Sequence, residues 1–243
     1  MITSMCDKRI PDRRVSDCTI SASGISDQLL SGLTAHESHT STDAFTPLSP
    51  GLICVTNRSL CQEDFLARIE RLAKAQPAAI LLREKDLREE AYCELAEKVL
   101  CICKKQKTLC ILHNYANAAH TLRHPALHLP LPALRRLSET EHHSYQILGA
   151  SCHSAEDAKE AEALGCTYIT AGHIFDTDCK KGLPGRGLDF LREICTSVSI
   201  PVYAIGGICP ENLSSVKAAG AAGACIMSSA MTCEDADVYL SSF

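Results

Sequence analysis

The chain has 243 residues, 46% of them hydrophobic, which is enough for one large domain or two small ones. Its net charge is −5 and it has no basic tract, so a small molecule is a better candidate partner than a nucleic acid. We find no signal peptide and no apolar run near the ~18 residues needed to span a bilayer, so neither secretion nor membrane insertion is expected.

The 15 cysteines are scattered and include no C-x₂-C pair. Cys101 and Cys103 fall in a helical pattern, whereas Cys54 and Cys225 fall in strand patterns. Scattered cysteines of this kind are usually small buried residues in a reducing cytosol, not disulfides or zinc ligands. We therefore expect a cytoplasmic protein.

Residues 1–50 differ in composition from the rest of the chain, being rich in Ser, Thr, Asp and Gly. We interpret them as a disordered or loosely attached leader, and residues 51–243 as the folded domain. An organelle transit peptide is the alternative, but acidic residues are interspersed, which such peptides avoid.

From residue 51 onward, short apolar runs alternate with helical patterns. The strand patterns lie at 52–56, 78–83, 108–113, 126–129, 146–151, 167–171, 201–205 and 223–227. The helical patterns lie at 63–75, 88–104, 154–164, 188–195 and 210–219. Eight such strands predict a compact α/β fold, the (β/α)₈ TIM barrel, whose third and fourth units leave little room for helices. An open doubly wound sheet is the alternative, but "VTNRSL" after the first strand has no phosphate-binding glycine.

In such a barrel, functional residues gather at the carboxyl ends of the strands. These positions hold Arg83, Lys85, His113, Asn114, His128, Ser151, His153, His173, Gly206, Gly207, Ser228 and Ser229. The last four follow the seventh and eighth strands, where barrels often bind phosphate through backbone donors. A plain tight turn at the two glycines is the alternative interpretation.

The other candidates allow a functional and an ordinary interpretation. Arg83 and Lys85 could bind an anion or form a solvated charge cluster, and Lys181 with its neighbour Lys180 lies in a glycine-rich loop that could close over a substrate. Four histidines suggest a metal cluster, but no pair of them is established on one helix face; they are His113, His120, His124 and His128.

Four segments carry a family resemblance. "LLREKDL", "GASCHSAEDAKEAEALGCTYI", "GHIFDTDCKKGLPGRGL" and "IPVYAIGGICPENLSSVKAAGAAG" resemble the thiamin phosphate synthase/TenI superfamily over nearly all of residues 52–230. The resemblance implies a (β/α)₈ barrel of thiamin biosynthesis, a thiazole phosphate as substrate and a small homo-oligomer.

The family includes a synthase and a TenI-like tautomerase. The synthase joins a pyrimidine diphosphate to a thiazole phosphate with Mg²⁺, whose carboxylate ligands would fall on Asn114 and Ala133 here. Neither residue is anionic, and the family glutamine before Arg83 is replaced by Leu81. The resemblance therefore implies the synthase less well than the tautomerase, which needs no metal cofactor.

The tautomerase aromatises a thiazole carboxylate phosphate by moving a proton from the ring C2 to the exocyclic carbon. The family histidine falls on His173, which we expect to be the general acid/base. The expected substrate-binding residues are Arg83, Lys85, Asn114, Ser151, Lys181, Gly206, Gly207, Ser228 and Ser229. Besides the synthase, a non-catalytic barrel that senses thiazole phosphate is a further alternative.

Overall fold

The structure is a computed structural model that describes residues 48–243, apart from the side chain of Cys179. The expected leader over residues 1–50 therefore lies outside the described residues, except for its last three positions.

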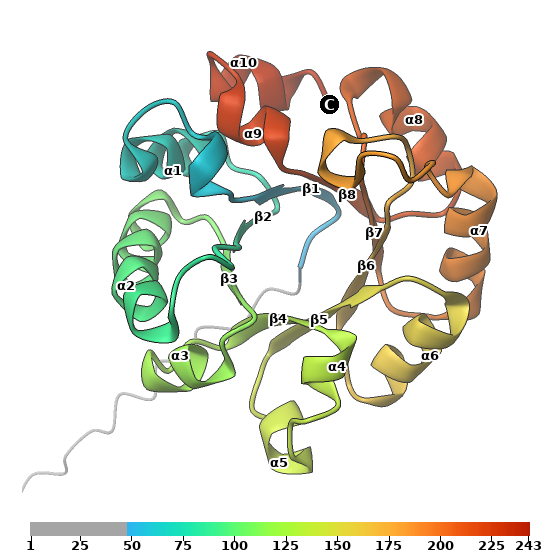
Figure 1. Ribbon diagram of the computed structural model, residues 1–243, viewed down its shortest axis with the longest axis horizontal. Coiled ribbons are helices and arrows are strands. Elements are labelled where there is room, and N and C mark those ends of the chain that lie inside the picture. The colour runs from blue at the N-terminus through green and yellow to red at the C-terminus, as the bar shows by residue number, and fades with distance from the viewer. Residues whose placement is uncertain (1–47) are drawn as a thin grey trace, which may run out of the picture. The chain divides into compact units, whose positions relative to one another are not determined.

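Eight parallel strands close into a barrel in chain order, which confirms the predicted (β/α)₈ fold (Figure 1). The strands are β1 Gly51–Val55, β2 Ala79–Leu82, β3 Cys110–His113, β4 Ala126–Pro130, β5 Ile147–Cys152, β6 Tyr168–Gly172, β7 Val202–Ile205 and β8 Gly223–Ile226. The barrel closes where β1 pairs with β8, with Gly51 opposite Gly223. All eight carboxyl ends therefore meet at one end of the barrel, here called the barrel mouth.

Helices surround the barrel on its outside (Figure 1). They are α1 Phe65–Lys74, α2 Glu89–Gln106, α3 Ala116–Thr121, α4 Leu131–Leu134, α5 Glu139–His142, α6 Ala155–Ala163, α7 Gly187–Ser197, α8 Pro210–Ala218, α9 Ser228–Thr232 and α10 Ala236–Ser241, with short 3₁₀ turns η1 Arg58–Leu60 and η2 Asp178–Lys180. The helices α3, α4 and α5 are short, as the weak helical pattern of the third and fourth units predicts. None of the helices among residues 48–243 is both long and apolar enough to cross a membrane.

Capping residues set the helix boundaries, which short-range patterns predict only approximately. Asp64 accepts a hydrogen bond from the backbone of Ala67, so α1 begins two residues later than expected. Ser154 caps α6 in the same way through Asp157 N, and Pro210 is the first residue of α8. Gly165 and Gly220 have positive φ angles directly after helices, as expected for residues that end them.

Side chains alternate between two buried clusters along the strands. The outward-facing apolar residues pack against the helices, whereas a smaller set, including Ile53 and Ile111, fills the barrel interior. Two fully buried tyrosines, Tyr168 and Tyr203, also belong to the interior. Their ring centroids lie 5.8 Å apart in an edge-to-face arrangement.

Glycines on neighbouring strands make room for these tyrosines. A Cβ atom at Gly149 would collide with the Tyr168 ring and lie 2.6 Å from Nδ1 of His128. A Cβ atom at Gly223 would lie 2.8 Å from the Tyr203 ring. The glycine in the fifth strand pattern is therefore explained by packing inside the barrel.

We predict that Gly149→Ala destabilises the protein by about 1–3 kcal/mol, because the added methyl group overpacks a filled interior. Urea unfolding measures the loss. Adding Tyr168→Leu to the same chain should recover part of it, because the smaller side chain vacates the space. A Gly149→Ala variant as stable as the wild type would show that the interior adjusts without cost.

Candidate active site at the barrel mouth

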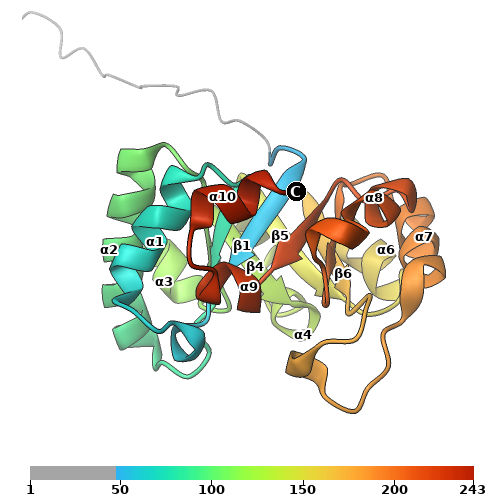
Figure 2. The same cartoon turned by 90° about the horizontal axis from the view of Figure 1, so that it is seen from above.

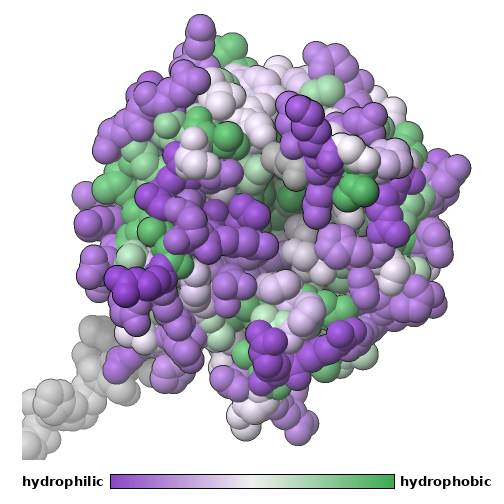
Figure 3. Space-filling model, viewed as in Figure 1, coloured by the Kyte–Doolittle hydropathy of each residue, from purple (hydrophilic) through white to green (hydrophobic). Residues whose placement is uncertain are grey.

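The barrel mouth carries a hydrophilic centre and one long projecting loop. Seen down the barrel, hydrophilic side chains gather around the centre of this face (Figure 3). The loop between β6 and α7, which includes η2, extends beyond the other loops of this end (Figure 2). Residues from several strand ends therefore meet beneath one loop.

Three positively charged side chains lie near one another at the mouth: Arg83 and Lys85, which follow β2, and Lys180 in the loop between β6 and α7. Burial lowers the pKa of Lys85, and the nearby charges of Arg83 and Lys180 lower it further. No ion pair between described residues uses any of the three. Uncompensated positive charge of this kind attracts an anionic ligand.

A buried carboxylate anchors the segment that carries Arg83 and Lys85. The Thr56 hydroxyl donates to Glu84 at 2.6 Å, and the Arg58 backbone amide donates to the same carboxylate at 3.0 Å. The Arg83 amide in turn donates to the Thr56 hydroxyl oxygen at 2.9 Å. Burial nevertheless raises the pKa of Glu84. This network joins the ends of β1 and β2 and fixes the backbone on both sides of Glu84.

Two histidines are buried beneath the cations. The rings of His113 and His128 stack with centroids 5.7 Å apart and planes inclined by 17°. Burial lowers the pKa of His128 to about 3, with Lys85 adding to the effect, and it lowers the pKa of His113 in the same direction. Both rings are therefore neutral near pH 7. Among the described residues, Nδ1 of His113 has no hydrogen-bond partner.

His128 forms a hydrogen-bonded chain across three strands. Its Nδ1 lies 2.9 Å from the Tyr168 hydroxyl oxygen, and its Nε2 lies 2.9 Å from Oγ of Ser151. Tyr168 is fully buried, whereas Ser151 is partly exposed at the end of β5. The chain therefore runs from the barrel interior to the mouth.

His173 follows β6 directly and is partly exposed. Its Nε2 lies 3.2 Å from the backbone carbonyl of Leu183, on the far side of the projecting loop. The loop is held further by the Gly185 amide, which donates to the Asp176 carboxylate at 2.7 Å, and by the Arg186 amide, which donates to the His173 carbonyl at 3.1 Å. The structure thus places His173 at the mouth, at the base of this loop.

Gly206 and Gly207 follow β7 with φ angles of +100° and +64°. A Cβ atom at Gly206 would lie 2.8 Å from Cα of His173, and one at Gly207 would lie 2.8 Å from Cβ of Phe175. Close packing against the loop between β6 and α7, here called the β6 loop, therefore explains why both positions hold glycine, without a ligand. A role in phosphate binding remains a prediction.

The structure separates the two serines after β8. Ser228 lines a cavity of about 700 Å³ together with Lys180, Lys181 and other residues of the β6 loop. Ser229 instead lines a different hollow, beside Cys233 and Tyr239. Of the pair, Ser228 is the residue that shares a cavity with Lys181 of the expected site.

The positions expected to bind Mg²⁺ in a synthase do not offer carboxylates here. Asn114 lies in the left-handed region with a φ of +73° and donates its backbone amide to the His128 carbonyl at 3.0 Å. Ala133 lies in α4 and packs against the outer core. Within residues 48–243, no three His, Cys, Asp or Glu side chains converge as a metal site. This donor set does not suit Mg²⁺, which prefers anionic oxygen ligands.

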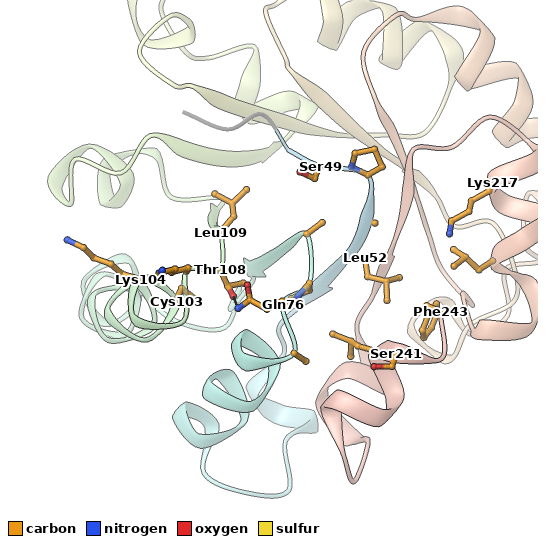
Figure 4. Close-up of a pocket in the computed structure, with 18 of the residues that line it drawn as sticks. Ser49, Leu52, Gln76, Cys103, Lys104, Thr108, Leu109, Lys217, Ser241 and Phe243 are labelled. Atoms are coloured by element: carbon orange, nitrogen blue, oxygen red, sulfur yellow. Dashed lines mark hydrogen bonds between the residues drawn. The ribbon is translucent and has the colours of Figure 1, made fainter. Parts of the chain in front are cut away.

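A second cavity lies at the opposite end of the barrel from the mouth. It has a volume of about 1170 Å³, and Ser49, Gln76, Lys104, Lys217 and Phe243 are among the residues that line it (Figure 4). None of the expected site residues borders it. We therefore place the candidate site at the mouth, where the charged and titratable groups converge.

The sequence analysis missed two parts of this site. The sequence places Tyr168 in a strand but does not reveal its contact with His128. Period-2 alternation nevertheless puts Tyr168 on the same interior face as Thr170. The link between Thr56 and Glu84 was also missed, because it joins residues 28 positions apart. Only the barrel register reveals such a contact.

Residues 52–230 match the family described as thiamine monophosphate synthase. A putative thiamine-phosphate synthase 2 of Aquifex aeolicus is 34% identical over 174 residues, covering 72% of this chain and 94% of that protein. The thiamine-phosphate synthase of Syntrophomonas wolfei is 32% identical over 191 residues, covering 76% and 90%. The solved thiamine phosphate pyrophosphorylase of Pyrococcus furiosus aligns with a TM-score of 0.68 and 28% identity over 79% of this chain and 93% of that one.

Two of these relatives carry the synthase name, the third is named a thiamine phosphate pyrophosphorylase, and none of the three is named as a tautomerase. The matched range begins in β1 and ends in α9, so it covers all eight strands and the whole mouth. The chain belongs to the thiamine monophosphate synthase family.

Proposed function

We propose that this member of the family is a thiazole tautomerase, which aromatises a thiazole carboxylate phosphate by proton transfer. The observation that carries the proposal is the position of His173 at the base of the loop between β6 and α7, where its Nε2 contacts Leu183, a residue that lines one cavity with Lys181 and Ser228. A metal-free proton transfer also suits a mouth with histidine, amide and hydroxyl groups but no cluster of carboxylates among the described residues.

The hydrogen bond of His173 assigns a chemical role to each ring nitrogen. A backbone carbonyl only accepts hydrogen bonds, so Nε2 carries the proton that is donated to Leu183. Nδ1 is then unprotonated in the neutral ring and is the atom that takes the proton from the ring C2. The same atom returns the proton to the exocyclic carbon, and aromatisation drives the reaction forward.

The cations at the mouth would bind the two anionic groups of the substrate. Arg83, Lys85 and Lys181 would hold the carboxylate, with Asn114 directly after β3 and Ser151 at the end of β5. Gly206, Gly207, Ser228 and Ser229 would hold the phosphate, the last through its backbone because this residue borders a different hollow. Distinct sites for the two groups would fix the ring orientation relative to His173.

Thiamine-phosphate synthase is the second candidate function, and the names of the relatives favour it over the tautomerase. A synthase would couple a pyrimidine diphosphate to a thiazole phosphate. The two candidates differ in substrates and in metal requirement, so one pair of assays separates them.

We predict that excess EDTA leaves conversion of the ylidene thiazole phosphate unchanged. In a parallel assay with pyrimidine diphosphate, thiazole phosphate and Mg²⁺, we expect no thiamine phosphate above the protein-free control. Both products can be quantified by liquid chromatography. Thiamine phosphate formation that needs Mg²⁺ would replace the tautomerase with the second candidate.

A further inference from the structure

The hydrogen-bonded chain of Tyr168, His128 and Ser151 fixes which atoms donate and which accept, as well as the positions of these side chains. Each of its members has a limited choice of donor and acceptor roles. Burial raises the pKa of Tyr168, so its hydroxyl keeps its proton and needs an acceptor. Among the described residues, Nδ1 of His128 is the one atom that its hydroxyl contacts at hydrogen-bond distance.

This donor determines which nitrogen of the His128 ring carries the proton. Because the Tyr168 hydroxyl donates to Nδ1, that nitrogen is unprotonated, and the proton of the neutral ring lies on Nε2. Nε2 then donates to Oγ of Ser151 at 2.9 Å. If Nδ1 carried the proton instead, the hydroxyl proton of the buried Tyr168 would have no acceptor. An unsatisfied donor costs more free energy when it is buried than when it is exposed to water.

We propose that His128 is a positioning residue that leaves the Ser151 hydroxyl proton free to donate to an anionic group of the ligand. Ser151 is partly exposed at the end of β5, and no other hydrogen bond from its side chain exists within the described part of the chain. The Ser151 oxygen already accepts a hydrogen bond from His128. The Ser151 hydroxyl proton is therefore available to donate to a bound ligand. The inference rests on the proposed function only in the choice of that acceptor.

The surroundings of His128 favour an anionic acceptor, and the proposed function makes that acceptor the carboxylate. Lys85 is close enough to lower the pKa of His128, and Arg83 and Lys180 lie near Lys85. An anion held by these cations would meet a hydroxyl donor from β5. Gly149 supports the arrangement, because any larger side chain there would displace both Tyr168 and His128.

Nitrogen-15 NMR of histidine-labelled full-length protein tests the tautomer, because protonated and unprotonated ring nitrogens have well-separated shifts. We expect the Nε2–H tautomer for His128 in the wild type and a mixture of tautomers in Tyr168→Phe. Tyr203→Phe is the matched control: it removes another interior hydroxyl, which donates to the Ser49 carbonyl at the other end of the barrel. The control should leave the tautomer unchanged.

Isothermal titration calorimetry tests the consequence for binding, with the aromatic thiazole carboxylate phosphate and with the same thiazole phosphate lacking the carboxylate. Ser151→Ala should weaken binding of the first ligand roughly 10-fold and of the second only slightly; Tyr168→Phe should act in the same direction. An Nδ1–H tautomer in the wild type overturns the proposal, as do variants that bind both ligands as the wild type does. A wild type that binds neither thiazole would contradict the proposed function, while the NMR result would still decide the tautomer.

Discussion

Replacing His173 with asparagine should lower kcat by roughly 10²–10⁴-fold while KM changes little. Asparagine retains some hydrogen-bonding capacity toward the Leu183 carbonyl but cannot exchange a proton near pH 7. The phosphate and carboxylate contacts of the proposed site do not involve His173, so binding should persist. Steady-state kinetics with the ylidene thiazole phosphate measures both constants, and circular dichroism checks the fold.

His153→Asn is the matched control for this experiment. His153 is exposed, and its Nδ1 lies 3.0 Å from the carbonyl of Gly172, directly before His173. The control therefore disturbs the same strand end without removing the proposed base, and its kcat should stay near the wild-type value. A folded His173→Asn protein with near-native kcat would refute the proton-transfer role of His173.

Acidification should destabilise the protein through the buried histidines His113 and His128. The pKa of His128 is about 3 in the folded chain, against 6.5 for an exposed histidine, so the unfolded chain binds more protons between these pH values. Stability therefore falls as the pH drops below 6.5. For His128 alone the loss at pH 4.5 is roughly 2–3 kcal/mol, and His113 acts in the same direction. Glu84 acts in the opposite direction, because its pKa is raised.

Urea unfolding at pH 7 and pH 4.5 measures this dependence. In His128→Gln, the difference in unfolding free energy between the two pH values should shrink by about the loss assigned to His128. His143→Gln is the control, because His143 is exposed after α5 and should leave the difference unchanged. An unaltered difference in His128→Gln would mean that His128 is not held neutral by the fold.

The sequence predicts the barrel because each strand is a buried apolar run and each long helix has recognisable caps. Asp64, Ser154 and Pro210 mark helix starts through local hydrogen bonds or a fixed backbone angle, which short-range patterns reveal. The expected site residues could likewise be located, because the carboxyl ends of parallel strands must meet. Family resemblance, not spacing, singled out His173 among the histidines.

The contacts inside the mouth could not be predicted from the sequence, because they depend on barrel register. Tyr168 reaches His128 across β5 only because Gly149 leaves space between them. Ser228 and Ser229 are adjacent in the chain, yet at the start of α9 they border different hollows. Gly206 and Gly207 suggested a ligand, whereas in the fold they also accommodate the β6 loop.

The most direct test of the proposed tautomerase is a proton NMR time course of the ylidene thiazole carboxylate phosphate in D₂O with a catalytic amount of protein. We expect the aromatic product to form well ahead of the protein-free rate, with solvent deuterium at the former exocyclic carbon because Nδ1 of His173 exchanges its proton. Conversion no faster than in buffer, from a folded protein that forms thiamine phosphate in the parallel Mg²⁺ assay, would contradict it.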